Sequence, residues 1–169
     1  LTMYSGMRIG EICALKWSDI DLQSGIIRIS KTVQRINDKI GNSKTKIIVG
    51  SPKSRTSERE IPIPNFLVNI LNERRQNENN YILSGTHKLI EPRTMQNRFK
   101  SVLKKCGIRN VNFHLLRHTY ATVCIENGFD AKTVSELLGH SNVNITLNRY
   151  VHSSLDTKKK YVEKLNFVA

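Results

Sequence analysis

Two periods of hydrophobic and polar positions divide this chain into strand-like and helix-like segments. Apolar and polar residues alternate in Ile27-Arg28-Ile29 and again over Arg59 to Pro64, while Lys46 to Val49 is rich in β-branched residues. Alternation of this kind turns one face of a strand towards a core. Prolines 62 and 64 suit an edge strand, because proline cannot donate a hydrogen bond to a ladder. We therefore expect a small antiparallel sheet in this region.

Outside that region, apolar residues recur every three or four positions, which is the helical period. The helices are expected over residues 8–15, 66–75, 92–107, 114–128, 130–139, 144–152 and 156–165. Asn65 and Asp130 are expected to cap their helices, and Pro92 suits a first helical turn. One apolar stripe comprises Met95, Phe99, Val102, Leu103 and Cys106. The predicted fold class is mainly α with a small antiparallel β-sheet (α+β).

The length of 169 residues fits one domain with a substantial core. Leu1 to Tyr4 resembles the end of an apolar helix, and no helix start signal precedes it. We therefore expect residues 1–169 to be one domain of a longer protein whose N-terminal part is absent from this sequence. No apolar run reaches the length of a membrane span and no segment resembles a signal peptide, which favours a soluble, cytoplasmic protein with no membrane partner. Cys13, Cys106 and Cys124 lack metal-ligand spacing, and we expect them to be reduced core residues.

The formal net charge of +13 indicates a polyanionic partner, because a protein that neutralises phosphates releases their counterions. Basic residues far outnumber acidic ones from Arg28 to Arg59, and Arg93 to Arg109 contains no acidic residue. The alternative is a solvated lysine-rich surface. The uneven distribution favours a nucleic-acid face, although charge alone does not separate DNA from RNA.

Two short motifs place basic residues where a phosphate could bind. His114 and Arg117 are spaced i, i+3, so on a helix they share one face with Cβ atoms about 5–6 Å apart. His140 follows Leu138-Gly139, at the end of a predicted helix, and Tyr150 lies ten residues later. Each has a simpler interpretation: a surface His–Arg pair, a helix-terminal cation or a core aromatic. For Arg8, the simpler interpretation is a salt bridge to Glu11.

Breaking a DNA strand while conserving its bond energy requires a nucleophile that keeps the phosphate covalently attached, as a tyrosine oxygen can. Because the reference pKa of tyrosine is about 10, this nucleophile needs a nearby base. The pentacoordinate phosphate needs positive donors on its nonbridging oxygens, and the leaving 5′ oxygen needs a proton. A set of two arginines, two histidines, one lysine and one tyrosine meets these demands without a metal.

Four segments together resemble the signatures of the tyrosine recombinase, or phage integrase, family in order and in spacing. They are Ser5-Gly6-Met7-Arg8-Ile9-Gly10-Glu11, His114-Leu115-Leu116-Arg117-His118-Thr119, Leu137-Leu138-Gly139-His140-Ser141 and Asn148-Arg149-Tyr150. The resemblance covers essentially the whole chain as that family's C-terminal catalytic domain. It is nearest to integrases of conjugative transposons and phages of low-GC bacteria.

Carried over residue by residue, the resemblance implies that Arg8 and Arg117 clamp the scissile phosphate and that Tyr150 is the nucleophile. His114 matches the position that exchanges a proton with the tyrosine. His140 matches the position that donates to a nonbridging oxygen. The implied fold is that of the family's catalytic domain, and no cofactor is implied.

Three further residues take their interpretation from the same resemblance. Lys53, in a segment of turn composition near a hairpin tip, matches the lysine that protonates the leaving oxygen, although Arg55 lies nearby. Glu11 is expected to support Arg8. His118 has no clear family role, and we expect it to be buried and hydrogen-bonded.

The implied function is site-specific recombination or integration through a 3′-phosphotyrosine intermediate. The implied partner is double-stranded DNA, with a homo-tetramer on DNA that exchanges C-terminal tails and with accessory proteins that bend DNA or set direction. Two alternatives stay open: a type IB topoisomerase, against which His114 argues, and a noncatalytic DNA-binding or architectural protein. A bacterial, nucleoid-associated location follows from the resemblance.

Overall fold

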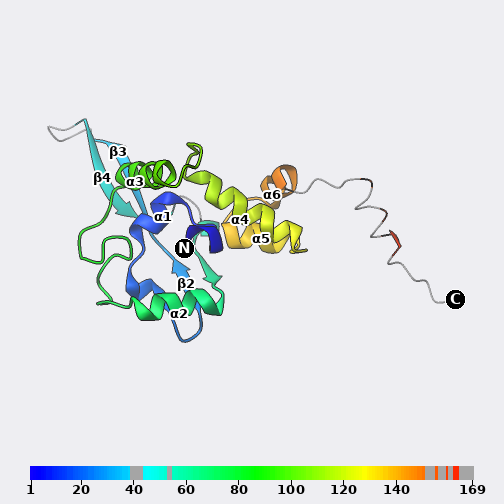
Figure 1. The fold of residues 1–169 in the computed structure, drawn as a ribbon, viewed down its shortest axis with the longest axis horizontal. Coiled ribbons are helices and arrows are strands. Elements are labelled where there is room, and N and C mark those ends of the chain that lie inside the picture. The colour runs from blue at the N-terminus through cyan, green and yellow to red at the C-terminus, as the bar shows by residue number, and fades with distance from the viewer. Residues whose placement is uncertain (39–43, 53–54, 151–154, 156–158, 160–161, 164–169) are drawn as a thin grey trace.

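The strands come from the first half of the chain and most of the helices from the second half. The two parts meet around residues 1–8, which precede the helix α1 (Ile9–Ala14) (Figure 1). The computed structural model describes residues 1–38, 44–52 and 55–150 and, beyond these, residues 155, 159, 162 and 163. Its elements are α1 (Ile9–Ala14), β1 (Ile20–Asp21), β2 (Ile26–Ile29), β3 (Thr32–Asn37), β4 (Thr45–Gly50), β5 (Arg59–Pro62), α2 (Asn65–Glu73), α3 (Pro92–Lys105), α4 (His114–Glu126), α5 (Ala131–Leu138) and α6 (Val143–Tyr150). No helix among the described residues has the length and apolar character needed to cross a membrane.

The strands form two antiparallel sheets instead of the single sheet that we expected. One sheet has the order β1-β2-β5, with Ile27 opposite Ile61 and both side chains fully buried. The prediction of an edge strand at 59–64 is confirmed, because β5 is the last strand of this sheet. The β-rich segment at 46–49 belongs instead to a ribbon in which β4 pairs only with β3. Through β3, this ribbon packs against α1.

Gly10 allows this close packing of the ribbon on α1. A Cβ atom at Gly10 would lie 2.5 Å from the hydroxyl oxygen of Thr32 and 2.7 Å from the carbonyl oxygen of Val33. Val33 is buried beside Cys13 and Ala14 of α1. The missing side chain therefore lets β3 approach the helix that begins directly after Arg8.

Besides this contact between α1 and β3, the core contains a large cluster under the first sheet and a smaller one among the later helices. The first contains Met7, Ile12, Trp17, Ile27, Ile61, Leu67 and Phe113. The second contains Ala121, Cys124, Val134 and Leu138. Gly6 joins the two regions in the left-handed conformation, with a φ of 60°, and a Cβ there would lie 2.6 Å from the Tyr120 ring and 2.8 Å from Leu138. The residues before Arg8 can therefore pass directly against α4 and α5.

The helix boundaries agree with most of the expected caps. The Asp130 carboxylate accepts from the backbone N–H of Thr133 at 2.9 Å, and Pro92 is the first residue of α3, so both predictions are confirmed. Gly139 ends α5 with a φ of 64°. The prediction for Asn65 is wrong: Pro64 holds the cap position, and Asn65 is already helical. The helix expected over 156–165 lies largely outside the described residues.

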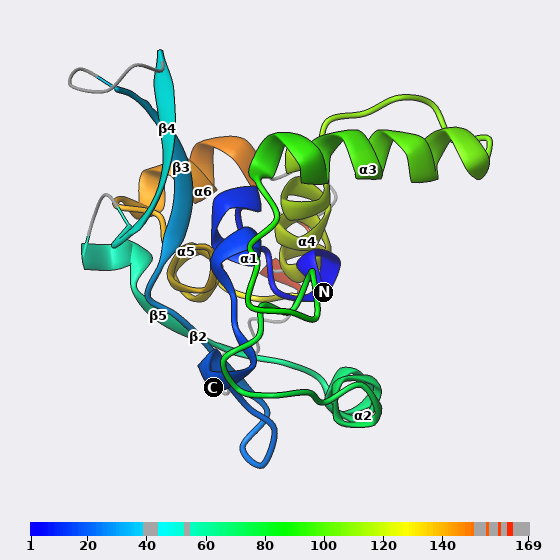
Figure 2. The same ribbon diagram turned by 90° about the vertical axis from the view of Figure 1, so that its left-hand side faces the viewer.

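The C-terminal half of α3 projects beyond the body of the molecule, as Figure 2 shows. This explains why part of its predicted apolar stripe is not in the core: Leu103 is buried, but Val102 is 56% exposed and Cys106 is exposed. The expectation that all three cysteines are core residues is therefore wrong for Cys106. Cys13 and Cys124 are buried free thiols, and burial raises the pKa of Cys13 to about 12.

Candidate active site

Arg8 stands at the start of α1 and links this helix to the end of α5. Its backbone N–H and its Nη1 donate to the two carboxylate oxygens of Glu11, at 2.8 and 2.7 Å. Its Nη2 donates to the carbonyl oxygen of Gly139 at 2.9 Å. The side chain is 37% exposed, so Arg8 is held in place while part of its guanidinium faces solvent. A donor placed in this way can reach an anion outside the protein.

Glu11 is a buried carboxylate shared by two arginines, which confirms that it supports Arg8. Arg59 of β5 donates to both Glu11 oxygens, through Nη1 at 3.1 Å and Nη2 at 2.9 Å. Burial alone would raise the pKa of Glu11, but hydrogen bonds and positive charge from Arg59 and Arg8 outweigh it and hold that pKa below its ordinary value. Glu11 is therefore ionised at neutral pH.

Arg59 is a residue of this site that the sequence interpretation did not single out. Besides Glu11, it donates to the carbonyl oxygens of Leu137 at 2.6 Å and Ser57 at 3.0 Å, and its side chain is only 6% exposed. The signal was present in the alternation of β5, because Arg59 is two residues from the buried Ile61 and so lies on the same face. A basic residue at a core-facing position predicts a buried acceptor or anion beside it, because an unpaired buried charge is costly.

Arg117 is buried in α4 with two backbone carbonyls as its hydrogen-bond acceptors. Nη1 donates to Gly6 at 2.8 Å and Nη2 to Leu138 at 2.7 Å, and the residue is 2% exposed. Burial, followed by the charge of Arg8, lowers the pKa of Arg117 to about 9, so the guanidinium is still protonated at neutral pH. A buried cation held by neutral carbonyls gains strongly from an anion placed beside it.

His140 follows the left-handed Gly139 and turns back towards α6. Its Nδ1 lies 2.9 Å from the hydroxyl oxygen of Thr146, which is fully buried. Burial, and then the charges of Arg117 and Arg8, lower the pKa of His140 to about 4, so its ring is neutral at neutral pH. Because Nδ1 is engaged with Thr146, Nε2 is the ring nitrogen left for a ligand, and Nε2 carries the ring proton in the tautomer whose Nδ1 accepts from the Thr146 hydroxyl.

The candidate nucleophile Tyr150 ends α6 and contacts α4. Its hydroxyl lies 2.5 Å from Nδ1 of His118, and the two rings are 5.7 Å apart. Our expectation of a hydrogen bond for His118 is confirmed, although the residue is only half-buried. His114, which starts α4 and is exposed, contacts the ring of His118 edge-on, with ring centroids 4.5 Å apart. The nearer neighbour of the tyrosine hydroxyl is therefore the second histidine of the motif.

Electrostatic effects in this group all disfavour additional positive charge. Although His114 is an exposed residue, partial burial of its ring lowers its pKa, with further lowering from His118 and Arg117. Partial burial likewise lowers the pKa of His118, and the charges of Arg149 and Arg117 add to this effect. Burial raises the pKa of Tyr150, and the same two arginines oppose that increase. Both histidines are therefore neutral at pH 7, and the tyrosine keeps its proton.

The structure brings together five of the six predicted site residues. Arg117 and Arg8 bind the carbonyls of two consecutive residues, 138 and 139, and His140 comes next in the chain. Lys53, the sixth, lies outside the described residues. A cavity of about 580 Å³ opens beside Arg8 and His140, and Pro52 lines its wall. In the described ranges, no three His, Cys, Asp or Glu side chains lie close enough to share a metal ion, so we assign no metal ligand.

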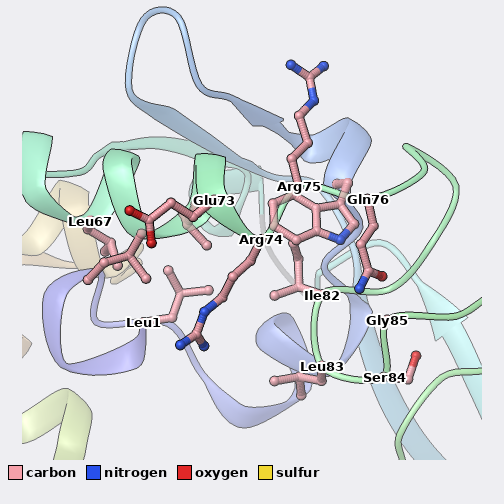
Figure 3. Close-up of a pocket in the computed structure, with 13 residues that line it drawn as sticks. Leu1, Leu67, Glu73, Arg74, Arg75, Gln76, Ile82, Leu83, Ser84 and Gly85 are labelled. Atoms are coloured by element: carbon pink, nitrogen blue, oxygen red, sulfur yellow. The ribbon is translucent and has the colours of Figure 1, made fainter.

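A second cavity, of about 630 Å³, lies beside α2 and the chain at 82–85 (Figure 3). Apolar side chains from Leu1, Leu67, Ile82 and Leu83 line much of it, together with Arg74. None of the five predicted site residues that the structure describes lines it. The cluster around Arg117 is therefore the candidate active site.

Comparison with known proteins is consistent with this geometry. A model of the phage integrase family matches residues 1–156. The chain is 36% identical, over 98% of its length, to a XerC-like tyrosine recombinase of Caldanaerobacter subterraneus subsp. tengcongensis, and covers 47% of that protein. It is 29% identical, over 97% of its length, to the tyrosine recombinase XerA of Thermococcus onnurineus and covers 52% of it. The chain thus spans about half the length of the curated relatives it matches.

Solved structures with the same fold include the Tn1549 transposon integrase in complex with a circular intermediate DNA. That structure has a TM-score of 0.74 at 23% identity, with 98% of this chain and 56% of that chain covered. The crystal structure of XerA recombinase has a TM-score of 0.65 at 25% identity, with 99% and 57% covered. These similarities confirm the expected fold class, mainly α with small antiparallel sheets.

Proposed function

This chain belongs to the phage integrase family, and from that premise we propose that it is the catalytic domain of a site-specific DNA recombinase. It cleaves and rejoins strands through a 3′-phosphotyrosine intermediate, to integrate or excise a mobile element or prophage. The observation that carries this proposal is the placement of Arg8 and Arg117 on consecutive carbonyls, with His140 next in the chain. The XerC-like relative, 36% identical, is named as a tyrosine recombinase, which supports the same function.

In this proposal, the two arginines and His140 bind the scissile phosphate. Arg117 supplies a charge that is already desolvated, so little reorganisation is needed when negative charge develops on the nonbridging oxygens. Arg8 is partly exposed and reaches the phosphate from the α1 side. Neutral His140 donates through Nε2, because Thr146 occupies its Nδ1.

Tyr150 acts as the nucleophile, and His114, at the family's position, exchanges a proton with it. Lys53 protonates the 5′ oxygen as it leaves. Pro52, which precedes this lysine in the sequence, lines the cavity beside Arg8 and His140, and this supports the proposed role of Lys53. No cofactor takes part in these steps.

The partner in this proposal is double-stranded DNA that contains the recombination sites. The net charge of +13 supports DNA binding, and structures of the Tn1549 integrase and of XerH, which have the same fold, contain DNA. The active assembly is a homo-tetramer that exchanges C-terminal tails between protomers and works with accessory proteins that bend DNA or set direction. Leu155 and Val162 are 69% and 65% exposed, which supports docking of the tail outside its own domain. The site of action is the bacterial nucleoid.

The two alternative functions receive less support. The relatives described above are named recombinases and integrases, so a type IB topoisomerase is not favoured. A noncatalytic DNA-binding protein would not require a buried arginine that donates to two backbone carbonyls, nor a tyrosine bound to a neutral histidine. Formation of a covalent adduct separates a recombinase from a pure DNA-binding protein.

The test is covalent capture of the protein on a pool of nicked DNA duplexes with randomised core sequences. Cleavage near the nick releases a short fragment that carries the 5′ hydroxyl. Once this fragment has diffused away, the strand cannot be rejoined and the protein stays attached to the DNA. Adducts that survive denaturing electrophoresis are sequenced on the DNA side and mapped by mass spectrometry on the protein side. We expect the phosphotyrosine at Tyr150, with Tyr150→Phe abolishing the adduct and leaving DNA binding nearly unchanged. Tyr4→Phe, at a tyrosine that is 48% exposed, is the matched control. A phosphotyrosine at Tyr81, Tyr120 or any other position would reject the assignment.

A further inference from the structure

Among the described residues, His118 is the one whose side chain hydrogen-bonds to the hydroxyl group of Tyr150, the proposed nucleophile. The second histidine of the α4 motif places Nδ1 2.5 Å from the Tyr150 hydroxyl oxygen, in the direct hydrogen-bond contact that a nucleophile needs with its base. His114 lies one helical turn before it and touches the edge of the same ring, at 4.5 Å between centroids. The three rings therefore form a row, in which His118 stands between His114 and the tyrosine.

The charges around this row keep the His118 ring neutral. Arg149, next to Tyr150 in the chain, and Arg117, one residue before His118, add to burial in disfavouring a protonated His118. In a neutral ring, one nitrogen carries a proton and the other accepts. In the tautomer that carries its proton on Nε2, Nδ1 of His118 accepts from the protonated Tyr150 hydroxyl, and this is the arrangement that a general base requires.

We infer that His118 holds the Tyr150 hydroxyl before DNA is cleaved and takes its proton as the phenolic oxygen attacks. This inference rests on the proposed function and refines the proton exchange assigned there to His114: the direct acceptor is His118, and His114 packs edge-on against the ring of that acceptor. The O–H bond of Tyr150 breaks, and its proton passes to Nδ1. An O–P bond forms, the bond from phosphorus to the 5′ oxygen breaks, and the leaving oxygen takes a proton from Lys53. Rejoining reverses each transfer.

The test compares His118→Asn with the wild-type chain on the duplex recovered by covalent capture. Asparagine can hydrogen-bond to the tyrosine hydroxyl but cannot take its proton. We expect a loss of about 10²–10⁴-fold in the cleavage rate, as when a general base is removed, with DNA affinity and thermal unfolding unchanged. His87→Asn, at an exposed histidine in the loop between α2 and α3, is the matched control and should cleave at the wild-type rate.

The pH profile separates proton transfer from a purely structural contribution. The wild-type rate should rise with pH through the pKa of His118, which lies below its ordinary value, and then level off. The rate of His118→Asn should keep rising about tenfold per pH unit towards the pKa of Tyr150, which lies above its ordinary value of 10. An unchanged rate and an unchanged profile in His118→Asn would overturn the inference.

A measurement without DNA tests the hydrogen bond itself. In ¹⁵N NMR spectra of the DNA-free chain, Tyr150→Phe should shift the Nδ1 resonance of His118, and an unchanged resonance would contradict the assignment. Whether the wild-type protein forms a covalent adduct distinguishes failure of the proposed function from failure of the role of His118. Absence of an adduct from wild-type protein would reject the proposed function, whereas full activity of His118→Asn would reject only the role of His118.

Discussion

Replacing Glu11 with glutamine should weaken both the fold and the site, because this one carboxylate serves two arginines. Oε1 accepts from Nη1 of Arg8 and Nη1 of Arg59, and Oε2 accepts from the backbone N–H of Arg8 and Nη2 of Arg59. In Glu11→Gln, one oxygen becomes an NH₂ group that faces two donors. Two of the four hydrogen bonds are therefore lost, and the positive charge of Arg59 stays buried.

The magnitude follows from those contacts. A hydrogen bond to a charged group contributes about 1.5–3 kcal/mol, and breaking a buried ion pair costs about 3–5 kcal/mol. Arg59 cannot reach water because its side chain is 6% exposed, whereas Arg8, at 37%, can turn partly towards solvent. We therefore expect Glu11→Gln to lower the free energy of unfolding by about 3 kcal/mol, at the lower end of this range.

Urea denaturation at pH 7 measures this loss, with Glu60→Gln as the control. Glu60 pairs with Arg28 at 3.3 Å, but both side chains are more than half exposed, so its loss should stay within about 1 kcal/mol. DNA cleavage by Glu11→Gln should also fall, because Arg8 loses the group that orients it. An effect on unfolding no larger than that of Glu60→Gln would refute the reasoning.

The same variant gives a pH dependence with a definite sign. Because the folded pKa of Glu11 is depressed, its contribution is fully present above the unfolded pKa of about 4.3 and is lost as pH falls through the folded value. The difference in unfolding free energy between wild type and Glu11→Gln should therefore narrow in acid. A difference that stays constant from pH 7 to pH 3 would contradict the depressed pKa.

Three other perturbations test separate parts of the molecule. Gly6→Ala should lower the free energy of unfolding by about 2–5 kcal/mol in urea denaturation, because Gly6 has a positive φ and the new methyl group would lie 2.6 Å from an aromatic ring of α4. Gly107→Ala is the control, since Gly107 has a similar φ but open space around it. Its cost should be limited to the strain of placing alanine at a positive φ, about 1–2 kcal/mol. On a duplex with a 5′-bridging phosphorothioate, whose sulfur leaves without a proton, cleavage by Lys53→Ala should recover and cleavage by Arg117→Ala should not; equal rescue of both, or of neither, would reject their roles. Deleting residues 155–169 should reduce both synapsis and cleavage of a nicked substrate, and unchanged values of both would refute tail exchange.

The sequence alone located most of the elements, because helical and strand periods are local properties. The stripes over α3, α4 and α5, the cap at Asp130 and the end of α5 at Gly139 were all predictable from neighbouring residues. The spacing of His114 and Arg117 placed them on one helical face, because residues three positions apart are neighbours on a helix surface. Charge and motif order then indicated phosphate chemistry.

Only the tertiary structure decided which of these faces meet. The hydrogen bond from Arg8 to Gly139 joins residues 131 positions apart, and no local pattern specifies it. The burial of Arg59 against Glu11 and the contact between His118 and Tyr150 depend in the same way on how β5, α1, α4 and α6 pack. A residue's period shows which side of its element it occupies, but its hydrogen-bond partner depends on what the fold brings to that side.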